Sequence, residues 1–260
     1  MIVKKNINKI FYIFLFFHLI LWTLIPSFTN NNLPLDTIEA LAWGSNLDWG
    51  FSKHPPLSAF AAEFFFTIFG SYDWAYYLLS QIFVLISFFF VWKLSNEILE
   101  DKTYSLISVL LLVGIYFYNF TTPEFNVNVS QLPFWAMTVY FFWKSLQTNR
   151  KSYWFIFGIS SALGFLSKYL FLYFLLSIFI YLLFNYKKYK NQINNYFFSV
   201  VISLLILTPH FLWLKENNFS TISYGLKRSS LGNNEIINHL INPLMFFFNQ
   251  LNILIPFFIM

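Results

Sequence analysis

Apolar runs follow one another along almost the whole chain, with only short polar breaks between them. The first run, Ile10 to Phe28, matches the roughly 20 residues that a helix needs to cross a bilayer. The later runs are Leu57 to Phe69, Tyr72 to Trp92, Tyr104 to Phe120, Val129 to Trp143, Trp154 to Ser167, Tyr169 to Phe184, Tyr196 to Leu214, and one from Leu240 to the end. Only 10% of the residues are charged, against about 25% in soluble domains. We therefore predict an all-α, polytopic transmembrane helical bundle with no separate water-soluble domain.

The first run could be a signal peptide or a retained span. Lys4, Lys5 and Lys9 precede it, as either interpretation requires. A signal peptide has an apolar core of about 7 to 15 residues and a small-x-small cleavage site. This run is longer and no such site follows, so we interpret it as a retained first span. The basic flank then predicts a cytoplasmic amino terminus.

Two runs decide how many times the chain crosses. Leu57 to Phe69 would cover only about 20 Å of a hydrocarbon core of about 30 Å. If it lies flat, most Lys and Arg residues fall on the cytoplasmic side, whereas a crossing divides them almost evenly, so we expect an interfacial helix. The run from Trp154 to Phe184 would be about 46 Å long as one helix. Both of its flanks are basic, which predicts two short helices that break at Ser167-Lys168 near the outer face.

These choices predict seven spans and the start of an eighth near Leu240, in a single module over residues 1–260. Two outer segments result: the loop at 29–71, and Lys215 to Glu235. The chain ends inside an apolar helix with no basic residue after it. We expect on that basis that the module is truncated at its C-terminus.

Cysteine is absent from the sequence, and the net charge is +5. Without cysteine, a disulfide scaffold, a thiolate zinc site and a cysteine nucleophile are excluded. The Lys and Arg residues are spread over the loops, where they act as topology signals in an integral protein. No basic block with interleaved aromatic residues occurs, so we expect membrane lipids and no nucleic acid as partners.

Two carboxylates stand in the first outer loop. On a helix that starts near Pro34, Asp36 and Glu39 are three residues apart and share a face. Paired acids can bind a hard divalent cation or divide acid and base roles. The alternative is that both only favour the positive end of a helix.

The loop around these acids carries a recognisable pattern. It reads L-x-L-D-x-x-E-A-x-x-W-G from Leu33, followed by W-G-[FY]-x-K-H-P-P-L from Trp49. This resembles the first outer loop of glycosyltransferase family 39 type enzymes, which are multi-spanning GT-C glycosyltransferases that include protein mannosyltransferases and the bacterial aminoarabinose transferase of lipid A. Further similar segments occur in order at 122–128, at 163–169, and from Pro209 through Trp213 to Asn217. The resemblance therefore runs from about Leu33 to Gln250.

The resemblance implies inverting transfer of a sugar from a polyprenyl-phosphate carrier to a glycolipid or protein acceptor. It also implies an active site on the periplasmic face of a bacterial inner membrane. Asp36 matches the catalytic aspartate of the family, the proposed base or metal-binding carboxylate. Related enzymes often have a second acid directly beside it, whereas here the next one is Glu39. An aspartate common at the start of the fourth span is replaced by Asn128, and Glu124 is the candidate to supply the missing charge. The resemblance therefore implies a divalent metal, Mg or Mn, held by Asp36 and Glu124. The two differences from the family pattern put this metal requirement in question.

Three basic residues are candidates for the donor phosphate. Lys168 stands at the predicted helix break, where a lysine is costly unless an anion meets it. It could instead snorkel to outer head groups. Lys53 and His54 precede Pro55-Pro56, which fixes a turn. They could hold phosphate or acceptor, or only cap that turn.

The remaining polar residues have simpler interpretations. Lys227 and Arg228 could bind the carrier or an anionic glycan, or face solvent and head groups. His18 is expected as an interhelical hydrogen-bonding residue, and His210 as a satisfied interface histidine. Glu63 and Asp73 most simply face polar surroundings. Because all these residues have such alternatives, the first outer loop stays the main candidate site.

Two rival functions remain. A lipid or glycan flippase or transporter would place charges near the bilayer midplane and show two related halves with broken helices. Here the acids gather in one outer loop and no second copy of the hairpin occurs. The other rival is a broken gene product that folds but lacks acceptor binding.

Overall fold

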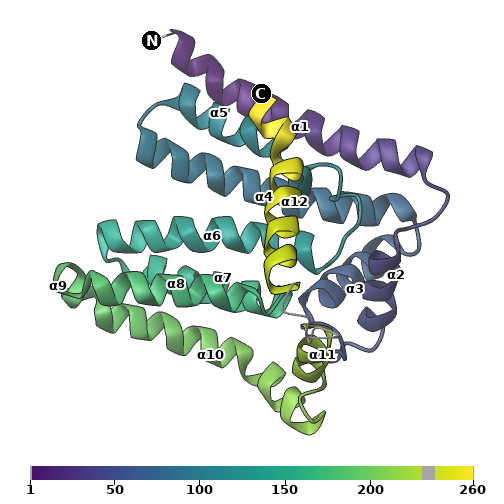
Figure 1. Ribbon diagram of the computed structural model, residues 1–260. Helices are drawn as coiled ribbons and strands as arrows, with labels where there is room; N and C mark the ends of the chain where they lie inside the picture. The colour runs from purple at the N-terminus through teal and green to yellow at the C-terminus, as the bar shows by residue number, and fades with distance from the viewer. Residues whose placement is uncertain (1, 230–237, 260) are drawn as a thin grey trace.

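The computed structural model describes residues 2–229 and 238–259. Within these ranges the chain is helical and contains no strand, which confirms the predicted all-α class. The helices, shown in Figure 1, are α1 (Ile2–Thr29), α2 (Leu35–Gly44), α3 (Leu57–Phe69), α4 (Asp73–Leu99), α5 (Lys102–Val113), η1 (Tyr116–Tyr118), α6 (Val127–Thr148), α7 (Lys151–Ser167), α8 (Phe171–Phe184), α9 (Tyr186–Tyr189), η2 (Lys190–Gln192), α10 (Ile193–Glu216), α11 (Ser220–Ser229) and α12 (Asn238–Ile259).

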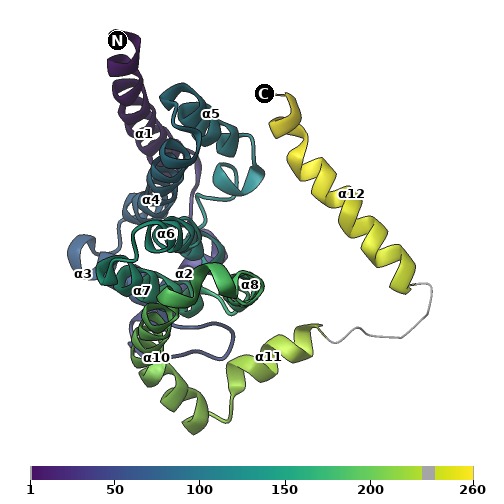
Figure 2. The same ribbon diagram turned by 90° about the vertical axis from the view of Figure 1, so that its left-hand side faces the viewer.

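The long helices stack side by side. α1 packs on α4, α4 on α6, α6 on α7, and α7 on α10. Figure 1 shows α2, α3 and α11 gathered at one end of this stack, with α9 at the other. Figure 2 shows α12 standing apart from the stack, and it contacts α5 and η1. The short helices of the first loop therefore cover one end of the bundle.

Among the residues that the structure describes, four helical stretches are long and apolar enough to cross a membrane: Asn6–Thr29, Asp73–Leu99, Tyr186–Glu216 and Leu240–Ile259. The predicted count of seven spans and an eighth is not confirmed. The run from Tyr104 to Phe120 shows one reason, because α5 ends at Val113 after 12 residues. That is about 18 Å of helix, too short for a crossing on its own. Gly114 follows α5 directly, and the apolar run continues through a short 3-10 turn instead.

The break predicted at Ser167-Lys168 is confirmed. α7 ends at Ser167, Lys168 is extended with φ −161° and ψ 133°, and α8 begins at Phe171. The helices have 17 and 14 residues, or about 25 and 21 Å. α3 likewise has the predicted bounds, while its position at the membrane surface stays a prediction.

The packing of α7 on α10 depends on a small residue. A Cβ on Gly158 would lie 2.6 Å from the carbonyl oxygen of Ser199, so only glycine permits this approach. The hydroxyl of Ser203 donates a 2.8 Å hydrogen bond to the Gly158 carbonyl at the same crossing. Close packing here fixes the end of α7, and with it Lys168, relative to α10.

The core between α1 and α4 is aromatic. Phe11 is fully buried and stacks on Trp92 with ring centroids 4.5 Å apart and planes 10° from parallel. Phe125, from the segment before α6, is also fully buried in this core. Between membrane-spanning helices such rings stabilise the packing by van der Waals contact, because lipid is as apolar as the core. The segment at 119–126 is thereby anchored to the bundle.

Candidate active site

α2 presents the first-loop acids, and its position depends on both of its ends. Pro34 precedes the helix with φ −59°, a value suited to a helix start. At the other end, a Cβ on Gly44 would lie 2.7 Å from the Ala59 carbonyl oxygen. Glycine therefore allows α2 to close onto α3. The predicted helix that carries Asp36 and Glu39 is confirmed.

Asp36 meets a segment that is far away in the sequence. Its backbone N–H donates a 3.2 Å hydrogen bond to Oε1 of Glu124. Oδ2 of Asp36 accepts a 3.4 Å hydrogen bond from the Asn126 side chain. Thr37 adds a buried contact, since its hydroxyl donates to the Phe125 carbonyl at 3.2 Å. The exposed Asp36 carboxylate and the Glu124 carboxylate therefore stand together at the edge of α2.

α4 and α6 fix the segment that carries Glu124. Gln81 of α4 donates a 3.1 Å hydrogen bond to the Thr122 hydroxyl, and Ser80 donates a short one to the Thr122 carbonyl. On the other side, the Asn126 side chain caps α6, because its oxygen accepts from the backbone N–H groups of Asn128 and Val129. These hydrogen bonds fix the short segment around Glu124 between α4 and α6.

Glu39 has a basic partner. Oε1 of Glu39 lies 2.5 Å from Nζ of Lys53, and both side chains are partly exposed. The hydrogen bond to Glu39 is the first cause that raises the pKa of Lys53. Asp36 and Glu39 share α2, as the spacing predicted, but each is engaged by a different neighbouring segment. The positive charge of Lys53 is thus balanced by the carboxylate of Glu39.

Lys168 has a different environment. Its Nζ donates a 2.5 Å hydrogen bond to Oδ1 of Asn128 in the first turn of α6. Among the residues that the structure describes, no carboxylate forms an ion pair with it. Burial lowers the pKa of Lys168, and the positive charge of Arg228 lowers it further. Two cations that approach each other without a carboxylate form a place where an anion is stabilised.

His54 connects the acids and the lysines. Burial lowers its pKa most, and the charges of Glu39, Lys168, Asp36 and Lys53 also act on it. Its carbonyl accepts a 3.1 Å hydrogen bond from the Phe51 N–H, which closes the turn before Pro55. The structure therefore brings the sequence-predicted site residues into one neighbourhood, namely Asp36, Glu39, Lys53, His54, Glu124, Asn128 and Lys168.

A hydrogen-bonded chain beside Lys168 was missed by sequence reasoning. The buried His210 lies with Nδ1 2.5 Å from the Trp49 carbonyl oxygen, so Nδ1 must donate. Its Nε2 then accepts from the Tyr169 hydroxyl at 2.7 Å. Burial raises the pKa of Tyr169 to about 12. Both ring nitrogens of His210 are hydrogen-bonded, as expected of a satisfied histidine, while its place at the membrane interface stays a prediction. For Tyr169 the sequence signal was its place directly after Lys168.

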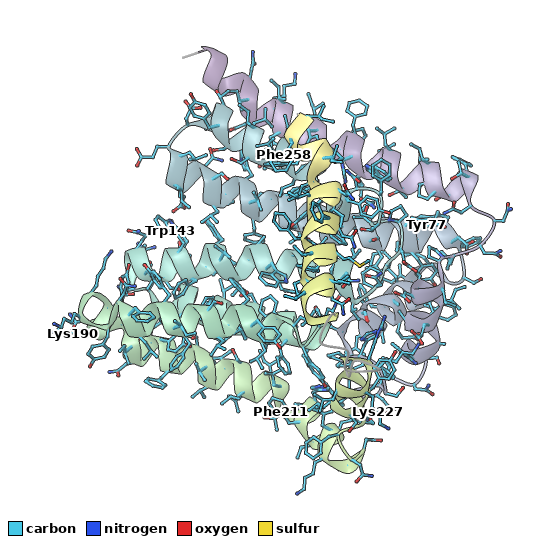
Figure 3. The ribbon with its side chains drawn as sticks, viewed as in Figure 1. Tyr77, Trp143, Lys190, Phe211, Lys227 and Phe258 are labelled. Atoms are coloured by element: carbon cyan, nitrogen blue, oxygen red, sulfur yellow. The ribbon has the colours of Figure 1, made fainter. Side chains whose placement is uncertain are left out.

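The Trp-Gly motif is held by the end of α10 and by α11. A Cβ on Gly50 would lie 2.3 Å from the Trp213 ring, so the ring covers this glycine directly. The Thr221 hydroxyl donates a 2.5 Å hydrogen bond to the Phe51 carbonyl. Figure 3 shows Phe211 and Lys227 at this end of the bundle, on α10 and α11. The two outer segments of the prediction therefore meet, although residues 230–235 of the second lie outside the described ranges.

Of the other predicted residues, Arg228 lies close to this neighbourhood, because its charge acts on Lys168, while His18, Glu63 and Asp73 lie away from it. His18 is buried and packs its ring against Phe88 of α4, at a centroid distance of 5.1 Å, so it lies between helices. Its buried Nε2 has no hydrogen-bond partner within the described residues, so the hydrogen-bonding part of the prediction is not confirmed. Lys227 and Arg228 occupy the last turn of α11. Glu63 and Asp73 line a separate cavity.

No group of three or more His, Asp or Glu side chains that could hold a metal occurs in residues 2–229 and 238–259. Asp36 and Glu124 offer two carboxylates at one place. A magnesium ion is commonly held by one or two carboxylates together with substrate phosphates. These two residues fit a metal ion whose coordination is completed by the phosphate of the donor. They do not fit a site in which the protein alone supplies all the ligands.

The comparisons with known proteins give one match. A sequence model of the dolichyl-phosphate-mannose-protein mannosyltransferase family matches residues 53–213, which include Lys53, His54, Glu124, Asn128 and Lys168. Asp36 and Glu39 precede the matched range. No curated protein and no solved structure matches the chain. Because the match covers more than half of the sequence, the chain belongs to the dolichyl-phosphate-mannose-protein mannosyltransferase family, and it is a membrane glycosyltransferase by that membership.

Proposed function

We propose that this protein transfers a sugar from a polyprenyl-phosphate carrier to a glycolipid or protein acceptor, with inversion at the anomeric carbon. One observation carries the proposal. The ammonium group of Lys168, which has no carboxylate partner among the described residues, lies in the same neighbourhood as the exposed Asp36 carboxylate. An anion-binding cation and a candidate base therefore stand together, as displacement of a phosphate leaving group requires.

In the proposed reaction, the acceptor oxygen attacks the anomeric carbon while the bond from that carbon to the phosphate oxygen breaks. The transition state has oxocarbenium character, and negative charge grows on the departing phosphate. Lys168 stabilises that charge, and the nearby Arg228 adds to the positive potential. Asn128 holds the Lys168 ammonium group in place until the donor binds.

Asp36 takes the proton of the acceptor hydroxyl. Its carboxylate is exposed, so an acceptor can reach it, and its backbone is tied to Glu124. A positioned base of this kind contributes about 10² to 10⁴ in rate. Glu39 keeps Lys53 close to α2 and gives that lysine a role in holding the loop in addition to phosphate binding.

Asp36 and Glu124 are the residues that would hold a Mg or Mn ion. When bound with the donor, such an ion supplies positive charge at the phosphate oxygens. Without the ion, Lys168 and Arg228 still provide positive charge at the phosphate, so the proposed displacement does not require a metal.

We place the protein in a bacterial inner membrane, with a cytoplasmic amino terminus and the site at the periplasmic face. The support is the basic flank before α1 and the gathering of α2, α3 and α11 at one end of the bundle. A carrier with an isoprenoid chain presents its sugar at the membrane surface, where these short helices would meet it.

The test uses the full chain in detergent with a radiolabelled polyprenyl-phosphate sugar. Asp36→Asn removes the base with little change in shape, and turnover should fall by about 10² or more. Asp48→Asn, at an exposed acid of the same loop, is the matched control. Near-normal turnover by the Asp36 variant would reject the assignment. Release of carrier phosphate without a membrane gradient separates a transferase from a flippase or transporter, and a glycolipid mass profile with and without the gene identifies the acceptor.

A further inference from the structure

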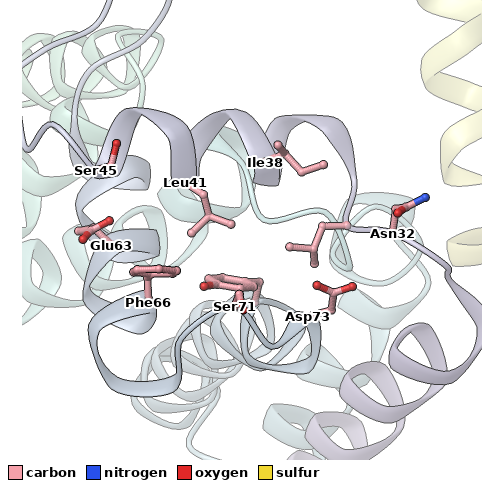
Figure 4. A pocket seen from close by; sticks show the side chains of 10 residues that line it. Asn32, Ile38, Leu41, Ser45, Glu63, Phe66, Ser71 and Asp73 are labelled. Atoms are coloured by element: carbon pink, nitrogen blue, oxygen red, sulfur yellow. The ribbon is translucent and has the colours of Figure 1, made fainter.

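A second concave region lies on the other side of α2. It is a cavity of about 360 Å³ between α2, α3 and the start of α4. Figure 4 shows side chains from these elements around it, with Glu63 and Asp73 on either side. Its apolar lining comes from Leu33, Ile38, Leu41 and Phe66. A mostly apolar hollow with a few polar groups is the usual form of a small-ligand site.

This cavity is distinct from the candidate active site. Ile38, Leu41 and Ser45, at helical spacing, form the face of α2 that lines it. Asp36 instead bonds to the segment before α6, and Glu39 pairs with Lys53. α2 therefore separates two sites and forms a wall of each.

The two charged residues of the cavity, Glu63 and Asp73, are both carboxylates, and Asn32, Ser45, Ser71 and Tyr76 add neutral polar groups to the lining. Neither Glu63 nor Asp73 forms an ion pair with a basic side chain in the part of the chain that the structure describes. Both carboxylates act electrostatically on the Tyr76 hydroxyl between them, and that hydroxyl already donates to the Gly70 carbonyl at 2.6 Å. Neither carboxylate accepts a hydrogen bond from a side chain in the described residues. A ligand with N–H donors and a positive charge would supply hydrogen bonds and a counter-charge to both.

The sequence of α3 supports the same conclusion. Glu63 is the one charged residue in the helix LSAFAAEFFFTIF. A carboxylate on an apolar helix near a membrane is expensive unless a cation meets it. On the same helix Phe64 and Ile68 are 62% and 56% exposed, which offers a surface for a hydrocarbon chain beside the cavity.

We propose that this cavity binds the primary ammonium group of an amphipathic molecule at the membrane surface. The carboxylates of Glu63 and Asp73 accept hydrogen bonds from the ammonium group, and the apolar tail lies along α3. Two sources carry this chemistry: the head group of phosphatidylethanolamine, and an alkyl-linked amino sugar. Binding here does not depend on sugar transfer at the other face of α2, and it is measured without turnover.

The experiment measures lipid retention on the purified full chain by native mass spectrometry. Phosphatidylethanolamine is compared with phosphatidylcholine and phosphatidylglycerol of the same acyl chains, and an alkyl glucosaminide with the matching glucoside. We expect the ligand with a primary ammonium group to bind about tenfold more tightly than its partner without one, equivalent to about 1.4 kcal/mol. The Glu63→Gln and Asp73→Asn double variant should lose this preference, whereas Asp48→Asn should keep it.

A second variant guards against misfolding. Ser45 is exposed at the rim, so Ser45→Phe fills the cavity without removing a charge. It should weaken retention of the ammonium ligand while the melting temperature of the protein stays unchanged. Preference for phosphatidylethanolamine alone identifies a lipid site, and preference for the glucosaminide alone identifies an amino-sugar site. Equal retention of all the ligands, or an unchanged preference in the double variant, overturns the proposal.

Discussion

Nζ of Lys168 donates a hydrogen bond to Oδ1 of Asn128 at 2.5 Å, which joins the break between α7 and α8 to the first turn of α6. The lysine therefore keeps its ammonium group at a fixed point of the site before any phosphate arrives. An amide oxygen is a weaker partner for a cation than a carboxylate, so an incoming phosphate can displace it.

The first prediction concerns transfer from the donor. Lys168→Gln removes the charge that meets the phosphate, and loss of a charge-assisted hydrogen bond of about 1.5 to 3 kcal/mol should lower kcat/KM for the donor by roughly 10- to 100-fold. Lys187→Gln, in α9 at the far end of the bundle, is the control. Steady-state kinetics with a water-soluble analogue of the carrier measure both. An unchanged kcat/KM in the Lys168 variant would exclude this residue from the phosphate site.

The second prediction tests how α10 holds the Trp-Gly motif. Gly50→Ala would place a Cβ 2.3 Å from the Trp213 ring, and such overpacking typically costs about 1 to 3 kcal/mol. Trp213→Leu in the same chain should recover part of the lost stability, because it removes the ring that the new methyl group strikes. Thermal unfolding in detergent compares the single and double variants. Equal melting temperatures for Gly50→Ala and the unmodified protein would contradict the packing described here.

The local part of this structure could be read from the sequence. Pro34 and the Pro55-Pro56 pair marked the starts of α2 and α3, and the length of the run from Trp154 to Phe184 required the break that occurs at Ser167. These features depend on neighbouring residues only. Where a run is apolar throughout, as from Tyr104 to Phe120, composition does not show that the helix ends at Val113.

The contacts between distant segments could not be read in this way. His210 binds the carbonyl of Trp49 across 161 positions, and Asp36 meets Glu124 across 88. Nothing in the local pattern distinguishes Lys53 as the partner of Glu39 from the other lysines of the chain. The family resemblance selected residues that the fold brings close together, while their individual partners required the fold.

The third prediction is a dependence of stability on pH through His54. Burial lowers its pKa below the ordinary value of 6.5, so the unfolded chain takes up a proton more readily than the folded one. The contribution is fully present above pH 6.5 and is lost as pH falls through the lowered folded pKa. His54→Gln should flatten this acid limb below about pH 6.5. Denaturant unfolding at each pH tests it, and an equally steep limb in the variant would exclude His54 as its source.

The last prediction isolates the hydrogen-bonded chain from Tyr169 through His210 to Trp49. Tyr169→Phe keeps the ring but removes the hydroxyl that Nε2 of the buried His210 accepts from, and an unsatisfied buried acceptor costs about 1 to 3 kcal/mol. Tyr173→Phe, at a side chain 70% exposed on α8, should cost far less. Since burial raises the pKa of Tyr169 to about 12, its phenol stays protonated at pH 7 and at pH 9 alike. The loss of unfolding free energy in the Tyr169 variant should therefore be the same at both pH values. A loss no larger than that of Tyr173→Phe at either pH would show that the phenol does not donate to His210.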